Sequence, residues 1–198
     1  MRIQIKLTGT TPLLLHNERL SDPDYEITKQ IKQLTDKGQN QTELDKAQIS
    51  RLEWQGSLYT NGSRELIMPA ANIVKCLRET AAYTREGKKV AGGLSPLNLY
   101  FPLLHDGPKD LEELYNKGPY VDRRQVKIGR SRIKRTRPIF PRWEVIADFE
   151  LFEDVLDYSR LERIAADAGR AQGLCDARIL GYGRFLSEIK KLGKVGPG

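Results

Sequence analysis

Apolar and polar residues alternate strictly at the start of the chain. Ile3, Ile5 and Leu7 share one side of residues 2–8, and polar residues occupy the other side. Because side chains alternate across a strand, this pattern predicts a half-buried β-strand. A bend and then a buried extended stretch are expected at 9–15.

Helices are predicted where apolar residues recur every three or four positions, at 22–38, 69–83 and 158–172, and a further helix is expected from Thr42 to about Gln55. Asp22-Pro23 has the form of an N-cap followed by proline at the first helical position. Ser159 and Glu162 have the spacing of a capping box, which would start the last helix.

Further strands are expected at 97–104, which is mostly apolar, and at 120–128, 139–151 and 182–189, where side chains alternate between the two sides of each strand. Asn61-Gly62, between 57–60 and 64–68, is a strong β-hairpin signal. Glycines and lysines indicate a mobile loop at 84–96. A short helix is expected near 109–115.

Two excursions, at 9–68 and 84–118, interrupt a simple order of elements. Without them the chain reads strand, helix, strand, strand, helix, strand. This βαββαβ order predicts an α+β fold with a modified ferredoxin-like (RRM-like) core, in which two helices cover one face of an antiparallel sheet. The other face would be open to a ligand, as in RNA-recognition modules. We expect one domain with three appended features, which are a helical insertion (about 17–56), a basic β-hairpin (about 120–142) and a disordered tail (about 190–198).

Composition narrows the class of protein. The 198 residues are 39% apolar and 30% charged, which is typical of a globular domain with its own core. No apolar run approaches the roughly 20 residues that cross a bilayer. Cys76 and Cys175 are too few for a disulfide framework, and two histidines add little metal-binding capacity. We therefore expect a cytoplasmic protein with reduced thiols, no cofactor and no membrane partner.

Positive charge is concentrated in one segment. Residues 121–142 hold nine Lys and Arg against Asp122 alone, whereas the whole chain has a net charge of +7. Such an excess repels itself unless a polyanion relieves it, and phosphate backbones are the commonest polyanion. We predict phosphate contacts from eight cations in an exposed hairpin whose segment 130–137 forms a loop. These are Arg123, Arg124, Lys127, Arg130, Arg132, Lys134, Arg135 and Arg137. The alternative is a solvated hairpin balanced by acidic residues elsewhere.

A second group of candidate contacts lies in the glycine-rich segment 173–185. Glycine allows a close approach of the backbone, Arg178 can contact phosphate, and Tyr182 can stack on a base. The alternative is a helix cap and an ordinary turn. Lys88 and Lys89 could contact phosphate or be solvated. His16 could contact a nucleotide or be a partly buried side chain.

Three stretches, together about four-tenths of the chain, resemble a known family. They are TGTTPLLLHN (8–17), MPAANIVKCLRETAAYTREGKK (68–89) and the stretch from RTRPIFPRWEV to ILGYGRF (135–185). They are similar to the RAMP superfamily of CRISPR-associated proteins, and within it to the backbone subunit that polymerises along guide RNA. Compact relatives of this kind occur in phages and prophages. The resemblance implies a ferredoxin-like core, a glycine-rich loop before the last strand, and sequence-independent binding of a single strand by side-by-side copies.

We therefore predict a non-enzymatic protein that binds single-stranded RNA, or single-stranded DNA, and assembles with copies of itself and with other CRISPR effector subunits. Two alternatives stay open. Some RAMP relatives cleave RNA with a loop Asp or a His-centred site, which makes Asp22, Asp24 and His16 candidates, although a helix cap already explains Asp22. The other alternative is an inhibitor that mimics a subunit and joins an effector complex.

Overall fold

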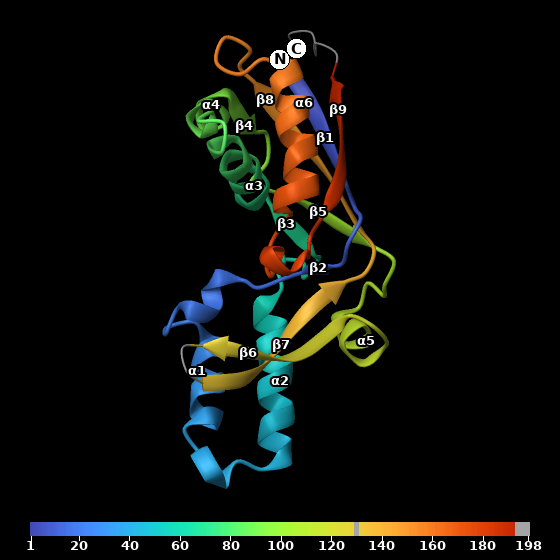
Figure 1. The fold of residues 1–198 in the computed structure, drawn as a ribbon. Helices are drawn as coiled ribbons and strands as arrows, with labels where there is room; N and C mark the ends of the chain where they lie inside the picture. Colours follow the sequence, from blue (N-terminus) through green and yellow to red (C-terminus); the bar gives the residue numbers. More distant parts are fainter. Residues whose placement is uncertain (129–130, 193–198) are drawn as a thin grey trace. The chain divides into compact units, whose positions relative to one another are not determined.

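The computed structural model describes residues 1–128 and 131–192. The chain divides into two compact units, both of mixed α+β composition (Figure 1). Unit 1 comprises Met1–Leu13, Thr60–Asp106 and Arg142–Gly198, and unit 2 comprises Leu14–Tyr59 and Gly107–Pro141. The helical insertion and the basic hairpin, which were expected within one domain, both lie in unit 2.

Unit 1 is built on an antiparallel sheet with the strand order β3-β5-β8-β1-β9, in which β4 also pairs with β8. Its strands are β1 (Arg2–Gly9), β3 (Ile67–Pro69), β4 (Leu94–Pro96), β5 (Tyr100–His105), β8 (Trp143–Leu151) and β9 (Phe185–Lys191). Ile5 of β1 is in register with Ala147 of β8 on one side and with Ile189 of β9 on the other. Because Ile3, Ile5 and Leu7 are fully buried, the strand predicted at 2–8 is confirmed.

Helices cover one face of this sheet. They are α3 (Ala70–Ala82), α4 (Gly87–Gly93) and α6 (Tyr158–Asp167), followed by the π-helical turn η3 (Ala168–Gln172) and the 3-10 turn η4 (Arg178–Leu180). Figure 1 shows α3 and α6 side by side against the sheet. Ile73 and Leu77 of α3 and Leu161 of α6 are buried, as are the sheet residues Val145 and Phe149. These buried side chains of the two helices and the sheet form the core of unit 1.

Several predictions for unit 1 were wrong. Residues 84–96 are not a loop, because Val90 is fully buried in α4 and β4 follows. The hairpin around Asn61-Gly62 reduces to one antiparallel bridge, Thr60 to Leu66, since Ser57 still belongs to a helix. The last helix starts at an Asp157 cap rather than at a Ser159 capping box.

Two of the predicted strands, at 182–189 and at 120–128, also differ from the structure. The last strand begins at Phe185. It includes Lys190 and Lys191, which were predicted to belong to the disordered tail. The rest of that tail, 193–198, lies outside the described residues. The strand predicted at 120–128 exists but belongs to the sheet of unit 2, and β5 pairs with β8 in its place.

Unit 2 combines a helical excursion with the basic hairpin. Its elements are η1 (Glu18–Ser21), α1 (Glu26–Thr35), η2 (Gly38–Asn40), α2 (Glu43–Ser57), α5 (Leu111–Asn116), β6 (Val121–Ile128) and β7 (Ser131–Phe140). The strands form an antiparallel pair, and the short β2 (Leu13–Leu14) completes the order β2-β7-β6. Trp54 and Phe140 are buried, and the Trp54 indole donates a hydrogen bond to the Tyr120 carbonyl at 2.9 Å.

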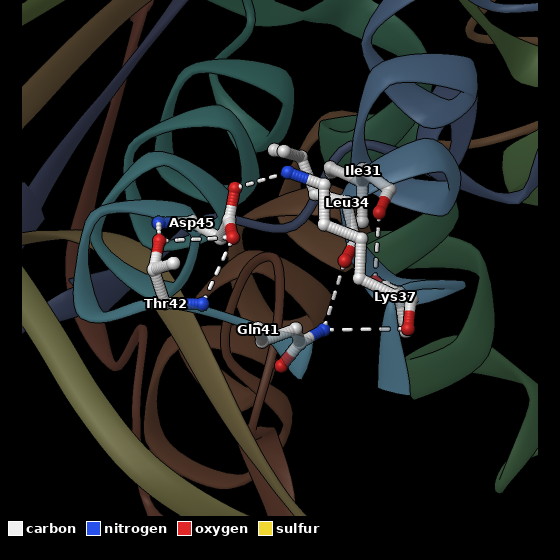
Figure 2. Close-up of polar contacts among 7 residues, drawn as sticks. Ile31, Leu34, Lys37, Gln41, Thr42 and Asp45 are labelled. Carbon is white, nitrogen blue, oxygen red and sulfur yellow. Dashed lines mark hydrogen bonds and ion pairs between the residues drawn. The ribbon is translucent and has the colours of Figure 1, made fainter. Parts of the chain in front are cut away.

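The helix boundaries of unit 2 follow the sequence signals only in part. Thr42 caps α2 in a capping box with Asp45, as expected for a helix starting there (Figure 2). Asp22 does not cap α1, whose N-cap residue is Tyr25. The Asp22 carboxylate instead accepts a hydrogen bond from the Asp24 amide at 2.9 Å and closes a local turn.

Within 1–128 and 131–192, no helix has both the length and the apolar character that a bilayer crossing requires.

Candidate nucleic-acid interface

The predicted loop 130–137 is wrong, because residues from Ser131 onward form β7 and pair with β6. The predicted strand 139–151 is accordingly divided, since β7 ends at Phe140 and β8 begins at Trp143. A strand forms here because its amides and carbonyls bond to β6 and its charged side chains stay at the surface. The basic segment is therefore a two-stranded ribbon with a defined register.

The register places like charges opposite each other. Arg124 of β6 is the direct partner of Arg135 of β7, and Lys127 is the partner of Arg132. Directly opposed like charges destabilise a strand pair. Arg130 lies outside the described residues, and only the backbone of Lys127 and Arg132 is described.

Two carboxylates offset part of this repulsion. The Arg124 Nε donates to Asp122 Oδ2 at 2.7 Å. Arg135 Nη1 donates to Oε1 of Glu53 in α2 at 2.5 Å, and the Thr136 amide donates to Oε2 of Glu53 at 2.8 Å. Glu53 is 5% exposed, so this carboxylate anchors β7 to α2. Nothing in the local sequence marks Glu53, because its partner lies 82 residues away.

Arg123 is held by neutral groups. Its Nη2 donates to the Tyr115 hydroxyl at 3.2 Å and its Nε donates to Ser50 Oγ at 3.3 Å. The guanidinium also lies 5.5 Å from the centre of the Tyr115 ring, which itself packs edge-on against Trp54. These contacts orient Arg123 without neutralising its charge. Tyr115 gave no signal in the sequence, because it lies in a short helix without a recognisable motif.

Lys134 is exposed, and its ammonium makes no hydrogen bond or ion pair with the residues that the structure describes. Arg137 is half-buried and stands opposite Asp122 in the register. The hairpin thus presents five described basic side chains, whereas the ion pairs above use two carboxylates. These five are Arg123, Arg124, Lys134, Arg135 and Arg137. A cationic surface remains.

The glycine-rich segment of unit 1 is held by its own fold. Arg178 Nη1 pairs with Glu79 Oε2 at 2.6 Å. Gly183 has a φ of +69°, its amide donates to the Pro12 carbonyl, and its carbonyl accepts from the Leu174 amide, both at 2.9 Å. Close backbone packing therefore accounts for Gly183. Tyr182 is half-buried in the same segment, and the predicted phosphate and base contacts of Arg178 and Tyr182 remain predictions.

The other candidates lie apart from these groups in the sequence. Lys88 and Lys89 are exposed on α4, where Lys89 Nζ lies 3.7 Å from Glu86. His16 is exposed in unit 2, and its carbonyl accepts a hydrogen bond from the Tyr59 hydroxyl at 3.1 Å. Their nucleotide contacts also remain predictions.

Two of the three residues considered for RNA cleavage, Asp22 and Asp24, lie in one turn. Asp22 accepts from the Asp24 amide, and the Asp24 carboxylate lies 3.3 Å from Lys29 Nζ. In the part of the chain that the structure describes, no three His, Cys, Asp or Glu side chains gather in a way that could hold a metal ion.

The open face of the unit 1 sheet balances its own charges. Lys6 Nζ lies 2.8 Å from Glu144 Oε2, and this contact raises the pKa of the Lys6 ammonium. Gln4 donates to Asp148 at 3.0 Å, and Thr8 donates to Glu144 at 3.3 Å. This face lacks the cationic excess of the hairpin.

No protein-family model matches the chain, and no curated protein is similar to it in sequence. The resemblance to the RAMP superfamily stays a prediction that depends on the three stretches named above.

Proposed function

We propose that the β6–β7 hairpin of unit 2 binds single-stranded nucleic acid, and RNA in particular, through its phosphates and with little sequence preference. The observation that carries the proposal is the positive charge that the ribbon keeps: Arg124 and Arg135 pair with Asp122 and Glu53, whereas Arg123 is held by neutral groups and Lys134 is exposed. A phosphate chain would relieve the repulsion and release its counterions on binding.

The kinds of side chain support phosphate contact. Arginine presents a planar fork that bonds two phosphate oxygens at once, and Arg123 is already oriented by Tyr115 and Ser50. Lys134 supplies an exposed point charge on the same ribbon. Phosphate contacts position a strand without reading its bases, which is why little sequence preference is expected.

We also infer that unit 1 is a ferredoxin-like core. The order β5-β8-β1-β9 supports this inference, because α3 lies between β1 and β5 in the chain and α6 lies between β8 and β9. Strands β3 and β4 and helix α4 are additions to that core. Membership of the RAMP superfamily belongs to the same proposal. So does side-by-side assembly along one strand, because binders without sequence preference commonly bind cooperatively.

The test is the salt dependence of binding to a fluorescent single-stranded RNA of mixed sequence, with single-stranded DNA in parallel. Each phosphate contact contributes a slope of about −0.7 in a plot of log affinity against log salt. About five contacts would weaken binding roughly a hundredfold between about 50 and 200 mM salt. A slope near zero would overturn the proposal.

One variant localises the effect. Lys134→Gln removes an exposed charge from β7 and should reduce the magnitude of the slope by about 0.7 without changing stability. Lys29→Gln, an exposed lysine of α1 in the same unit, is the matched control and should leave the slope unchanged. Equal effects of both substitutions would show that the hairpin is not the contact surface.

A further inference from the structure

Strand β9 forms one edge of the unit 1 sheet, and among the described strands it pairs with β1 alone (Figure 1). It has seven residues and no proline. The strand at the opposite edge, β3, has three residues and ends at Pro69, which cannot donate a ladder hydrogen bond. A long edge strand without proline is a template for a further strand. The proposed function does not use this edge.

The hydrogen bonds to β1 determine which backbone groups of β9 point outward. The Leu192 amide donates to the Arg2 carbonyl at 3.0 Å. At the other end, the Thr10 amide donates to the Arg184 carbonyl at 2.8 Å. Because bonded positions alternate along an antiparallel pair, the even-numbered residues of β9 bond to β1. The odd-numbered residues of 187–191 therefore direct their amides and carbonyls away from the sheet.

Neighbouring elements cover only part of this outer edge. A Cβ on Gly169 of η3 would lie 2.0 Å from the Phe185 carbonyl oxygen, so the start of the edge is closed. The Tyr158 hydroxyl donates to the Ile189 carbonyl at 2.8 Å, and that oxygen has a second lone pair. A groove of about 360 Å³ lies between α6 and residues 187–190. The fold therefore leaves room for a strand beside the middle of β9.

The open-face side chains of β9 carry opposite charges two positions apart. Glu188 and Lys190 are both exposed and neighbour each other on this face. The register partner of Glu188 is Lys6, which already pairs with Glu144 of β8. The register partner of Lys190 is Gln4, and Lys190 makes no ion pair with the residues that the structure describes. Both charges are therefore available to a strand on the free edge.

These charges are complementary to a second copy of the same strand. If two β9 strands pair antiparallel about a two-fold axis at Ile189, Glu188 of each copy lies opposite Lys190 of the other. A register shifted by two residues would instead set Glu188 against Glu188, or Lys190 against Lys190. A shift by one residue would not match the outward backbone groups. Only one register satisfies both the backbone and the charges.

We propose that two copies of this protein pair through β9 and extend the two sheets of unit 1 into one antiparallel sheet. Ile189 would exchange backbone hydrogen bonds with its own copy, and Ser187 would exchange them with Lys191. The contacts between Glu188 and Lys190 would fix the register. This two-fold contact goes beyond the proposed function, because side-by-side assembly along a strand needs head-to-tail contacts.

Sedimentation velocity of nuclease-treated protein without nucleic acid, at concentrations up to about 0.5 mM, tests the pairing. We expect a species of twice the 22.5 kDa chain mass whose share grows with concentration. Glu188→Lys and Lys190→Glu each set like charges opposite each other at two symmetric contacts. Association of either variant alone should therefore be at least about tenfold weaker. Lys109→Glu changes an exposed lysine of unit 2 and is the matched control, which should associate like the parent protein.

A mixture of the two single variants tests the register itself. Glu188→Lys presents two lysines and Lys190→Glu presents two glutamates, so every contact of a mixed pair joins opposite charges. The mixed pair should form with about the affinity of the parent protein. The doubly substituted chain, which carries both changes, should again pair with itself.

Ser187→Pro tests the backbone contribution. The Ser187 amide points away from β1, so proline at this position should keep the fold, which circular dichroism checks, and abolish the pair. A parent protein that stays monomeric overturns the proposal, and so does a dimer that neither the charge variants nor Ser187→Pro weakens. Because no nucleic acid is present, these results are independent of RNA binding by the hairpin.

Discussion

The sheets of the two units treat charge in opposite ways. In unit 1, Lys6 of β1 lies beside Glu144 of β8, and Gln4 bonds to Asp148. In unit 2, Arg124 and Arg135 pair with Asp122 and Glu53, but Arg123 is held by neutral groups and Lys134 is exposed. Both sheets are antiparallel, so the direction of strand pairing does not cause the difference. Unit 1 neutralises its surface internally, whereas the hairpin of unit 2 retains an excess that an outside anion can neutralise.

The glycine-rich segment, like the sheet of unit 1, pairs its charge within the fold. It was the second candidate contact for nucleic acid in the sequence, yet Arg178 pairs with Glu79, and Gly173 and Gly183 pack against backbone atoms. A residue type that is suited to phosphate therefore indicates a binding surface only where the fold has not already satisfied it. The comparison predicts that changes in this segment affect stability and that changes in the hairpin affect binding.

The largest expected effect is that of Gly183→Ala. A Cβ at this position would lie 2.1 Å from the Leu174 carbonyl oxygen, and the φ of +69° is unfavourable for alanine. We expect the free energy of unfolding to fall by about 3 kcal/mol or more, which combines backbone strain with the forced movement of packed atoms. Chemical denaturation monitored by circular dichroism measures it.

Gly181→Ala is the matched control. Gly181 has a φ of +88°, but nothing lies within 4 Å of its added Cβ. Only the backbone term of about 1–2 kcal/mol should remain. Equal losses in both variants would mean that close packing does not explain Gly183, and the segment would return as a candidate contact surface.

Periodicity predicted the elements better than their partners. Alternation found β1, and helical spacing found α3 and α6 within a few residues, because both patterns record which side of an element is buried. Alternation at 120–128 also found β6. It could not show that β6 pairs with β7 in unit 2, because pairing depends on residues elsewhere in the chain.

The basic strand itself was missed for a physical reason. Polar and charged residues dominate 131–137, so neither the alternation nor the composition of a typical strand is present. Hydrogen bonds to β6 and the anchor at Glu53 stabilise it instead.

The next prediction tests how the hairpin is anchored. Glu53→Gln removes the charge that offsets Arg135 but keeps an oxygen that can accept from the Thr136 amide. We expect the free energy of unfolding to fall by about 1.5–3 kcal/mol, the range of a hydrogen bond to a charged group. RNA affinity should be equal or higher in the folded variant, because the ribbon gains net positive charge.

Glu43→Gln provides the control for that substitution. It removes an exposed carboxylate of the same helix, whose ion pair is with Lys46 and whose pKa is lowered by Lys46 and, less, by Lys134, so it should not measurably change stability. A loss of RNA affinity in Glu53→Gln at unchanged stability would contradict the view that Glu53 serves the fold and limits the excess charge.

The smallest expected effect concerns the helical part of unit 2, where the comparison predicts internal compensation like that of unit 1. The hydrogen bond from Lys37, and then those from the Thr42 amide and hydroxyl, lower the pKa of Asp45 to about 2. In the unfolded chain this carboxyl titrates near about 3.9. Because the folded-state pKa is the lower one, the stabilisation is complete above about pH 4 and is lost as the pH falls towards about 2.

Denaturation of the parent protein and of Asp45→Asn between these values should therefore show a stability difference that shrinks with falling pH. Lys37→Gln removes the largest cause of the shift and should narrow the window from its acidic side. A difference that is independent of pH would show that the Asp45 charge does not stabilise the turn. The helical part of unit 2 would then not compensate its charge in the way that the sheet of unit 1 does.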